Sequence, residues 1–233
     1  KNSEKIYEEE TTGRFLTLLE NEEISHRAMA ILALSTGMRR GELFGLQWRH
    51  VDLETGLVHI EQASQYLPGK GIFTKKPKTD NSVRNITIPA SVCELLKKHR
   101  LAQAARRLKL GLMKDGGKWA GAEEQKDDFL FTKWDGRPSP PDSFNRWMQK
   151  FITDNNLPPL HPHSLRHMAA TYLITSGVDH RTVAGKLGHD VQTLNVVYSH
   201  LLKSAEKETA DKMEAFLKQA TEKAKANEKK QAK

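Results

Sequence analysis

The sequence predicts a mainly α-helical domain with a small antiparallel three-stranded β-sheet in its N-terminal third, an α+β fold. Apolar residues recur at helical spacing over most of the chain, whereas short β-prone runs gather between residues 57 and 88. With 233 residues, of which 37% are hydrophobic, the chain is long enough to bury a core as one large or two small domains.

Helices are predicted from apolar periodicity and from the residues that begin and end them. The segment 7–19 opens with three glutamates, which favour a helix N-terminus, and the nearly apolar segment 24–36 stops at Gly37, as a buried helix does. Pro89 opens a helix that runs to about residue 110. Further helices are expected over residues 143–155, 164–176, 182–187 and 193–200, and a long charged helix with sparse apolar positions ends the chain.

The strands of the predicted sheet are short runs bounded by turn residues. Residues 57–60, 72–75 and 83–88 are β-prone and are separated by the sequences Pro-Gly-Lys-Gly and Thr-Asp-Asn-Ser. Residues 111–128 lack periodicity, and we expect a mobile surface loop there. The Phe-Leu-Phe sequence at 129–131 is expected to be a short buried segment.

Charge and composition narrow the class of protein. The 37 Lys and Arg residues exceed the 29 Asp and Glu residues by eight, which favours a polyanionic partner such as nucleic acid, although a solvated basic surface gives the same count. The longest apolar stretch, residues 28–34, is far below the roughly 18 residues that span a bilayer, so no membrane association is expected. The single cysteine, Cys93, excludes an internal disulfide and indicates a reducing compartment.

Two polar clusters suit the binding of an anion. In HPHSLRH (161–167), a helix starting near residue 164 would place Arg166 in the first turn with His163 at its cap, where the helix dipole attracts a phosphate. An ordinary capped helix and a three-histidine metal site are the alternatives. In TGMRRGEL (36–43), Glu42 lies three residues after Arg39 and could orient that arginine toward a phosphate, whereas plain surface charge is the alternative.

Two further sites are weaker when taken alone. Lys75, Lys76 and Lys78 lie on a predicted turn and could reach into a substrate groove, although a solvated hairpin tip has the same composition. His189 follows a helix, and Tyr198 lies nine residues later on an apolar helix, where a tyrosine is usually part of the core.

In this order, the clusters resemble the catalytic domain of the tyrosine recombinase (integrase) family. The resemblance covers residues 7–200. The motifs that carry it are TGMRRGEL, the hairpin PKT followed by SVRNITIP, HPHSLRH, LGH and YSH. The GELFGLQW and YSH sequences resemble integrases of phages and conjugative transposons of Gram-positive bacteria more than chromosome dimer resolution recombinases.

The resemblance implies a covalent reaction on DNA. Tyr198 would attack a phosphodiester to give a 3′-phosphotyrosyl bond and a free 5′-hydroxyl, so religation needs no ATP. His163 matches the base that favours the phenolate, because an ordinary tyrosine has a pKa near 10. Lys78 matches the general acid that protonates the departing 5′-oxygen, an assignment that rests on the turn pattern.

The resemblance also implies how charge on the phosphate is stabilised. Arg39 and Arg166 match the two arginines that clamp the non-bridging oxygens, and His189 matches a residue that hydrogen-bonds the phosphate and supports the nucleophile. Glu42 and His167 are expected to orient Arg39 and the helix. No metal or cofactor is implied, since guanidinium groups do the electrostatic work.

The same resemblance gives a domain organisation and a set of partners. Residues 1–10 would be the remnant of an interdomain linker, residues 11–200 the catalytic domain, and residues 201–233 a C-terminal helix and basic tail that contacts another subunit. The expected partners are double-stranded DNA with attachment sites, three further copies of the chain in a homo-tetramer on DNA, and a directionality factor. The expected location is the cytoplasm of a bacterial host.

The implied function is integration and excision of a phage or conjugative transposon. Three alternatives stay open: a recombinase of the chromosome dimer resolution type, a topoisomerase-like enzyme that relaxes DNA, and a non-catalytic DNA-binding regulator with the same fold.

Overall fold

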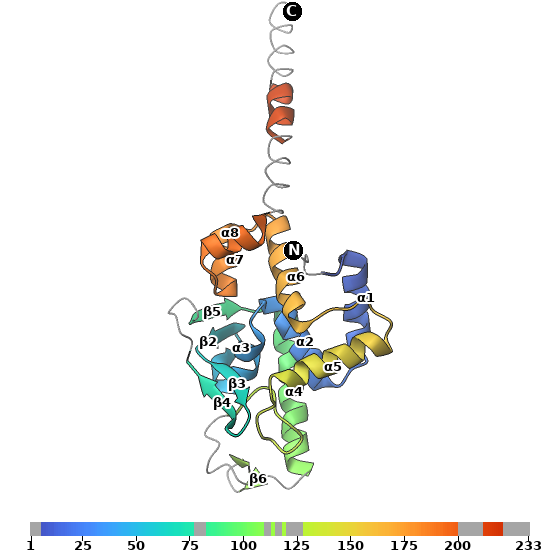
Figure 1. The fold of residues 1–233 in the computed structure, drawn as a ribbon, viewed down its shortest axis with the longest axis vertical. Helices are drawn as coiled ribbons and strands as arrows, with labels where there is room; N and C mark the ends of the chain where they lie inside the picture. Colours follow the sequence, from blue (N-terminus) through green and yellow to red (C-terminus); the bar gives the residue numbers. More distant parts are fainter. Residues whose placement is uncertain are drawn as a thin grey trace, which may run out of the picture.

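The computed structural model describes residues 6–76, 83–109, 113–114, 118–119, 128–199 and 212–220. Helices form most of it, and two small β-elements lie together on one side of the central helices (Figure 1). The helices are α1 (Glu9–Leu19), α2 (Ile24–Thr36), α3 (Arg40–Gly45), α4 (Ala90–Lys109), α5 (Asp142–Asp154), α6 (Pro162–Thr175), α7 (His180–Leu187) and α8 (Val191–Val197). Residues 212–220 are also helical.

Helix ends follow from the local sequence. Helix α2 stops where predicted, because Gly37 adopts a left-handed conformation (φ 64°) and its N–H donates to the carbonyl of Ala33. Helix α6 begins at Pro162, two residues before the predicted start, since proline needs no hydrogen-bond partner in a first turn. Arg166 therefore lies beyond the first turn, and the predicted phosphate seat at this helix start, with His163 as its cap, is wrong. His161 is the N-cap.

A three-stranded antiparallel sheet is present, but one of its predicted strands is wrong. The order is β1 (Val51–Asp52), β2 (Leu57–Ile60) and β5 (Arg84–Thr87), with Val58 between Val51 and Ile86. Residues 72–75 instead belong to β4 (Gly71–Lys75), which forms a separate hairpin with β3 (Ala63–Leu67). The tight turn with left-handed glycines at 69 and 71 pairs β4 with the segment directly before it.

The segment 111–128, expected to be a loop, contains a short strand pair. Strands β6 (Met113–Lys114) and β7 (Lys118–Trp119) are antiparallel neighbours. Two residues are too few for an alternating pattern to appear in the sequence. The remainder of 111–127 lies outside the described residues.

The core lies around α2, which packs against α4 and α6. Its largest fully buried side chains come from distant segments: Phe15, Phe44, Phe131 and Phe144. Residues 129–131 are buried as predicted, and Cys93 is a buried free thiol. None of the helices that the structure describes has both the length and the apolar character of a membrane span.

A second, smaller hydrophobic cluster joins α6, α7 and α8. Its buried members are Ala170, Ile174, Val183, Ala184, Leu187, Leu194 and Tyr198. The predicted nucleophile is therefore part of a cluster separate from the main core, at the end of the described globular part (Figure 1).

Candidate active site

Arg39 is the N-cap of α3, and Glu42 of the same helix fixes its position. The Arg39 backbone N–H donates to Oε2 of Glu42 (2.8 Å), and Nη1 of the Arg39 side chain donates to Oε1 (2.9 Å). This is the pairing expected from their spacing of three residues. The Arg39 side chain remains 41% exposed, so its guanidinium is accessible from solvent.

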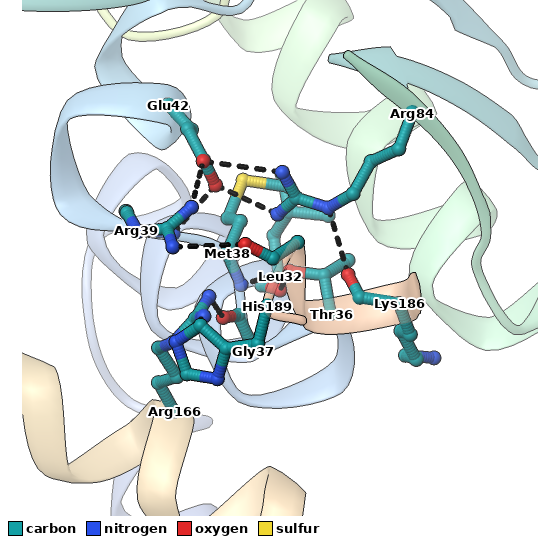
Figure 2. A network of polar contacts seen from close by, with 11 residues as sticks. Leu32, Thr36, Gly37, Met38, Arg39, Glu42, Arg84, Arg166, Lys186 and His189 are labelled. Atoms are coloured by element: carbon teal, nitrogen blue, oxygen red, sulfur yellow. Dashed lines mark hydrogen bonds and ion pairs between the residues drawn. The ribbon is translucent and has the colours of Figure 1, made fainter. Parts of the chain in front are cut away.

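Glu42 is buried and binds a second arginine that the sequence did not single out. Arg84, on β5, donates from Nη2 to Oε2 (2.8 Å) and from Nη1 to Oε1 (3.1 Å) of the carboxylate (Figure 2). Burial raises the pKa of Glu42, but the bonds and charges of Arg84 and Arg39 outweigh burial and lower it. Glu42 is thus ionised at neutral pH.

The turn after α7 is held by the same arginines. Helix α7 ends at Gly188, which has a left-handed conformation (φ 66°). The carbonyl of Gly188 accepts from Nη2 of Arg39 (2.9 Å), and the carbonyl of Lys186 accepts from Nε of Arg84 (2.8 Å). The turn that precedes His189 is thereby tied to α3 and to β5.

Arg166 is buried beside this turn. Its Nη1 donates to the carbonyl of Gly37 (2.6 Å), and its Nη2 lies 2.7 Å from Nε2 of His189. Burial and the neighbouring Arg39 lower the pKa of Arg166 to about 10, so the group is still charged at neutral pH. Burial, Arg166 and Arg39 lower the pKa of His189 to about 4. A neutral His189 can accept the Arg166 hydrogen bond at Nε2.

Tyr198 caps the C-terminus of α8 and is only 3% exposed. Its hydroxyl lies 2.9 Å from Nδ1 of His167, at hydrogen-bond distance. The rings of His167 and His163 meet edge to face with centroids 4.8 Å apart. The structure thus places His167 between His163 and the tyrosine, and brings Tyr198 to the same helix, α6, that carries Arg166.

Sequence reasoning assigned His167 only an orienting role and missed its contact with Tyr198. The HPHSLRH sequence could have placed His167 beside His163, because residues four apart lie on one face of a helix, but it carries no signal for the long-range contact with Tyr198. Lys78 lies outside the described residues, so its place in the site stays a prediction. Lys75 and Lys76, which precede it, are exposed at the end of β4.

Two open clefts meet at Arg39 and Arg40. One, of about 620 Å³, extends over β3 to Tyr66, and the other, of about 660 Å³, extends along α5 and the start of α6 to His163. Nη1 of Arg40 pairs with Asp142 at 2.7 Å. In the part of the chain that is described, no three His, Cys, Asp or Glu side chains are arranged to hold a metal ion. Arg39 and Arg40 thus line both clefts, and His161 and His163 line the cleft along α5.

A known protein family matches most of the chain. The model of the phage integrase family matches residues 5–205. The chain belongs to that family. This integrase-family chain is 30% identical over 214 residues to the ICEBs1 integrase of Bacillus subtilis (strain 168), a match that covers 91% of the chain and 55% of that protein. It is 29% identical over 185 residues to a XerC-like tyrosine recombinase of Caldanaerobacter subterraneus, covering 76% of the chain and 46% of that protein.

Solved structures confirm the α+β fold predicted from the sequence. The Tn1549 transposon integrase, in complex with transposon right end DNA, superposes with a TM-score of 0.72 at 22% identity, over 89% of this chain and 65% of that one. The XerA recombinase superposes with a TM-score of 0.64 at 22% identity, over 91% of this chain and 66% of that one. The chain spans about half the length of the curated relatives reported above.

Proposed function

We propose that this chain is the catalytic part of a site-specific DNA recombinase that integrates and excises a phage or conjugative transposon. One observation carries the proposal. Arg166 lies at hydrogen-bond distance from His189, and Arg39 donates to the carbonyl of Gly188, the residue before His189, so three residues that span 150 positions of sequence gather at one turn. Arg166 is 2% exposed, so we propose that the movement that exposes Tyr198 also uncovers Arg166, after which the two guanidinium groups can bind two oxygens of one phosphate.

The proposed reaction exchanges one phosphoester for another. The Tyr198 oxygen attacks phosphorus, a 3′-phosphotyrosyl bond forms, and the bond to the 5′-oxygen breaks. The phenolic proton passes to a histidine: His167 is at hydrogen-bond distance in the structure, and His163 is the base that the resemblance implies. Lys78 supplies the proton for the departing 5′-oxygen. Arg39 and Arg166 stabilise the pentacoordinate phosphorane, and His189 supports Arg166.

The buried position of Tyr198 implies a movement before cleavage. A side chain that is 3% exposed cannot reach a phosphate on the surface of a duplex. Because Tyr198 belongs to the small cluster of α6, α7 and α8, its release disturbs few residues of the main core. We propose that DNA and neighbouring subunits in a homo-tetramer draw this segment outward, with residues 201–233 as a subunit contact and residues 1–10 as a linker.

Attachment-site DNA is the proposed substrate, a directionality factor a further partner, and the bacterial cytoplasm the place of action. Among relatives, the ICEBs1 integrase favours the mobile-element assignment, whereas the XerC-like recombinase keeps chromosome dimer resolution as the second candidate. The two differ in substrate: an element end paired with an integration site, or a chromosomal dimer-resolution site.

The decisive experiment is capture of the covalent intermediate. The chain is mixed with nicked duplexes carrying the element's junction sequences, where loss of a short 5′-hydroxyl fragment prevents religation. We expect an SDS-resistant protein–DNA adduct that Tyr198→Phe abolishes and Tyr172→Phe, at an exposed tyrosine, retains. No adduct on a duplex that the chain binds in a gel shift would contradict the enzyme and favour a DNA-binding regulator.

A further inference from the structure

Arg84 joins Glu42 to the carbonyl of Lys186 in the polar network (Figure 2), yet none of the catalytic roles described above is assigned to it. We infer that Arg84 is a positioning residue for strand cleavage. It binds Glu42, which in turn binds Arg39, and it also binds the turn that leads to His189, so that Arg39 is held at a fixed place beside that turn. The inference rests on the proposed function. The contacts that carry it join residue 42 of α3, residue 84 of β5 and residues 186–189 at the end of α7.

The hydrogen bonds of Arg84 require a guanidinium group. Three of its nitrogens act at once: Nη1 and Nη2 bind the two carboxylate oxygens of Glu42, and Nε binds the carbonyl of Lys186. The side chain is 7% exposed, so water has little access to it, and a lost hydrogen bond would leave a buried donor without a partner. A lysine in its place would offer a point charge without the planar fork.

The backbone of the α7–α8 turn is built closely around Arg84. A Cβ atom placed on Gly188 would lie 2.7 Å from Nη1 of Arg84, closer than real Cβ contacts. Gly188 also needs its left-handed conformation to end α7. The carbonyl oxygen of Gly188 accepts a hydrogen bond from Nη2 of Arg39, so a shift of Arg84 against Gly188 would also move a partner of Arg39.

Arg84 also sets the charge of the site. Glu42 alone would neutralise Arg39, because the two groups share a short ion pair. With Arg84 bound to the same carboxylate, the three groups carry one net positive charge, which leaves Arg39 able to attract a phosphate. The buried Glu42 thus acts as a bridge between a structural arginine and a reactive one.

The kinetic test compares Arg84→Ala, Arg84→Lys and the control Arg137→Ala, whose arginine is exposed and pairs only locally with Asp135. On a nicked phosphodiester substrate we expect adduct formation to slow about 50-fold in Arg84→Ala and about 5-fold in Arg84→Lys, with Arg137→Ala unchanged. On a methylphosphonate substrate, which lacks one charged oxygen, a misplaced Arg39 matters less, so the Arg84→Ala deficit should shrink to about 3-fold. A deficit equal on both substrates, or an Arg84→Lys variant as fast as the parent, would overturn the inference.

A second measurement needs no DNA and covers the case in which Arg84→Ala does not fold. In ¹⁵N-arginine spectra of the parent and of Arg84→Lys, held guanidinium groups show slow rotation and separate Nη signals. We expect Arg39 to lose this separation in Arg84→Lys and to keep it in Arg137→Ala. An Arg39 signal unchanged in Arg84→Lys contradicts positioning. If the parent forms no adduct on either substrate, the proposed function fails, and the inference about catalysis fails with it. The Arg39 signals report separately whether Arg84 holds Arg39 in place.

Discussion

The carbonyl oxygen of Gly37 accepts a 2.6 Å hydrogen bond from Nη1 of Arg166, although 129 residues separate the two. The last carbonyls of a helix have no partner within it, and here the guanidinium of Arg166 satisfies a carbonyl at the end of α2. The end of a core helix therefore fixes the position of a buried arginine in α6. Gly37 permits this because its left-handed conformation turns the chain sharply after Thr36.

We predict that Gly37→Ala destabilises the protein strongly. The new Cβ would lie 2.5 Å from Cδ2 of the buried Leu187, and alanine disfavours a φ of 64°. Chemical denaturation should show a loss of about 2–4 kcal/mol in the free energy of unfolding. The control is Gly13→Ala, in α1 with no atom within 4 Å of its Cβ, which should gain about 0.5–1 kcal/mol. Equal effects of the two substitutions would contradict this account of Gly37.

Glu42→Gln should also destabilise the fold, for an electrostatic reason. Removing the carboxylate charge leaves the buried Arg84 without its ion-pair partner and frees the Arg39 backbone N–H from a charged cap. We expect a loss of about 2–4 kcal/mol in urea denaturation. Glu54→Gln, which removes an exposed ion pair with Lys97, should change stability by less than about 0.5 kcal/mol. A Glu42→Gln protein as stable as the Glu54→Gln protein would show that the buried pair contributes nothing net.

The two arginine contacts of Glu42, one with Arg39 and one with Arg84, show how far the sequence can predict the site. The Arg39–Glu42 pair is local, three residues apart on one helix, and its spacing alone predicts the contact. Arg84 reaches Glu42 across 42 residues, from a strand whose place beside α3 depends on the whole chain. His167 meets Tyr198 for a similar reason, because α8 must fold back on α6.

In the fold too, elements fixed by local sequence were predicted and an element without a local signal was missed. Helix α2 was predictable to the residue because apolar sequence and a terminal glycine agree. Strand β3 was missed because its sequence, Ala-Ser-Gln-Tyr-Leu, is mostly exposed and carries no apolar alternation. The hairpin turn at 68–71, read as a break within one sheet, instead creates a second one.

The pKa of His189 predicts a dependence of stability on pH. The folded-state pKa of about 4, lowered by burial and by Arg166 and Arg39, lies below the ordinary value of 6.5, so the unfolded chain binds more protons between these values. Stability should therefore rise with pH from 4 to 6.5 and level off above. Burial also lowers the pKa of His26, His50 and His99, so these residues add to the same pH dependence. The contribution of His189 is therefore the difference between the parent and a variant that lacks this histidine.

The parent should lose unfolding free energy when the pH falls from 7.5 to 5, and His189→Asn should lose about 1 kcal/mol less over the same interval. This value is smaller than the full pKa shift would give, because His189 is partly exposed to solvent. Denaturation at both pH values measures it, with His161→Asn at an exposed histidine as control. The explanation fails if the pH dependence of His189→Asn matches that of the parent.

Without DNA, Tyr198 should be protected from chemical modification. Tyr172 and Tyr66 are 71% and 52% exposed, whereas Tyr198 and Tyr7 are buried. Nitration reacts with the phenolate, and burial also raises the pKa of Tyr7 to about 12, which slows its reaction further. Peptide mass spectrometry after brief nitration should find Tyr172 and Tyr66 modified at least about tenfold faster than Tyr198. Tyr198 reacting as fast as Tyr172 would show that the closed arrangement at α8 is not the resting state.

The helix at 212–220 leads to a prediction about assembly. Met213, Phe216 and Leu217 lie on one helical face and are exposed, as expected for a surface that another subunit covers. Replacing all three by serine should leave the unfolding free energy of the free chain within about 0.5 kcal/mol, because they are exposed in the described structure. Assembly of several copies on attachment-site DNA, measured by mass photometry, should need about tenfold more protein.

The matched control changes the charged side of the same helix. Glu214 and Lys218 form an exposed pair with 2.7 Å between Oε1 and Nζ, and replacing both by glutamine retains the three apolar side chains. Such a pair is worth little to helix stability, so this variant should assemble as the parent does. If the serine variant assembles normally while the glutamine variant does not, charge rather than the apolar face joins the subunits. If neither variant changes assembly, residues 212–220 are not a subunit contact, and the exposed face has no role in the proposed tetramer.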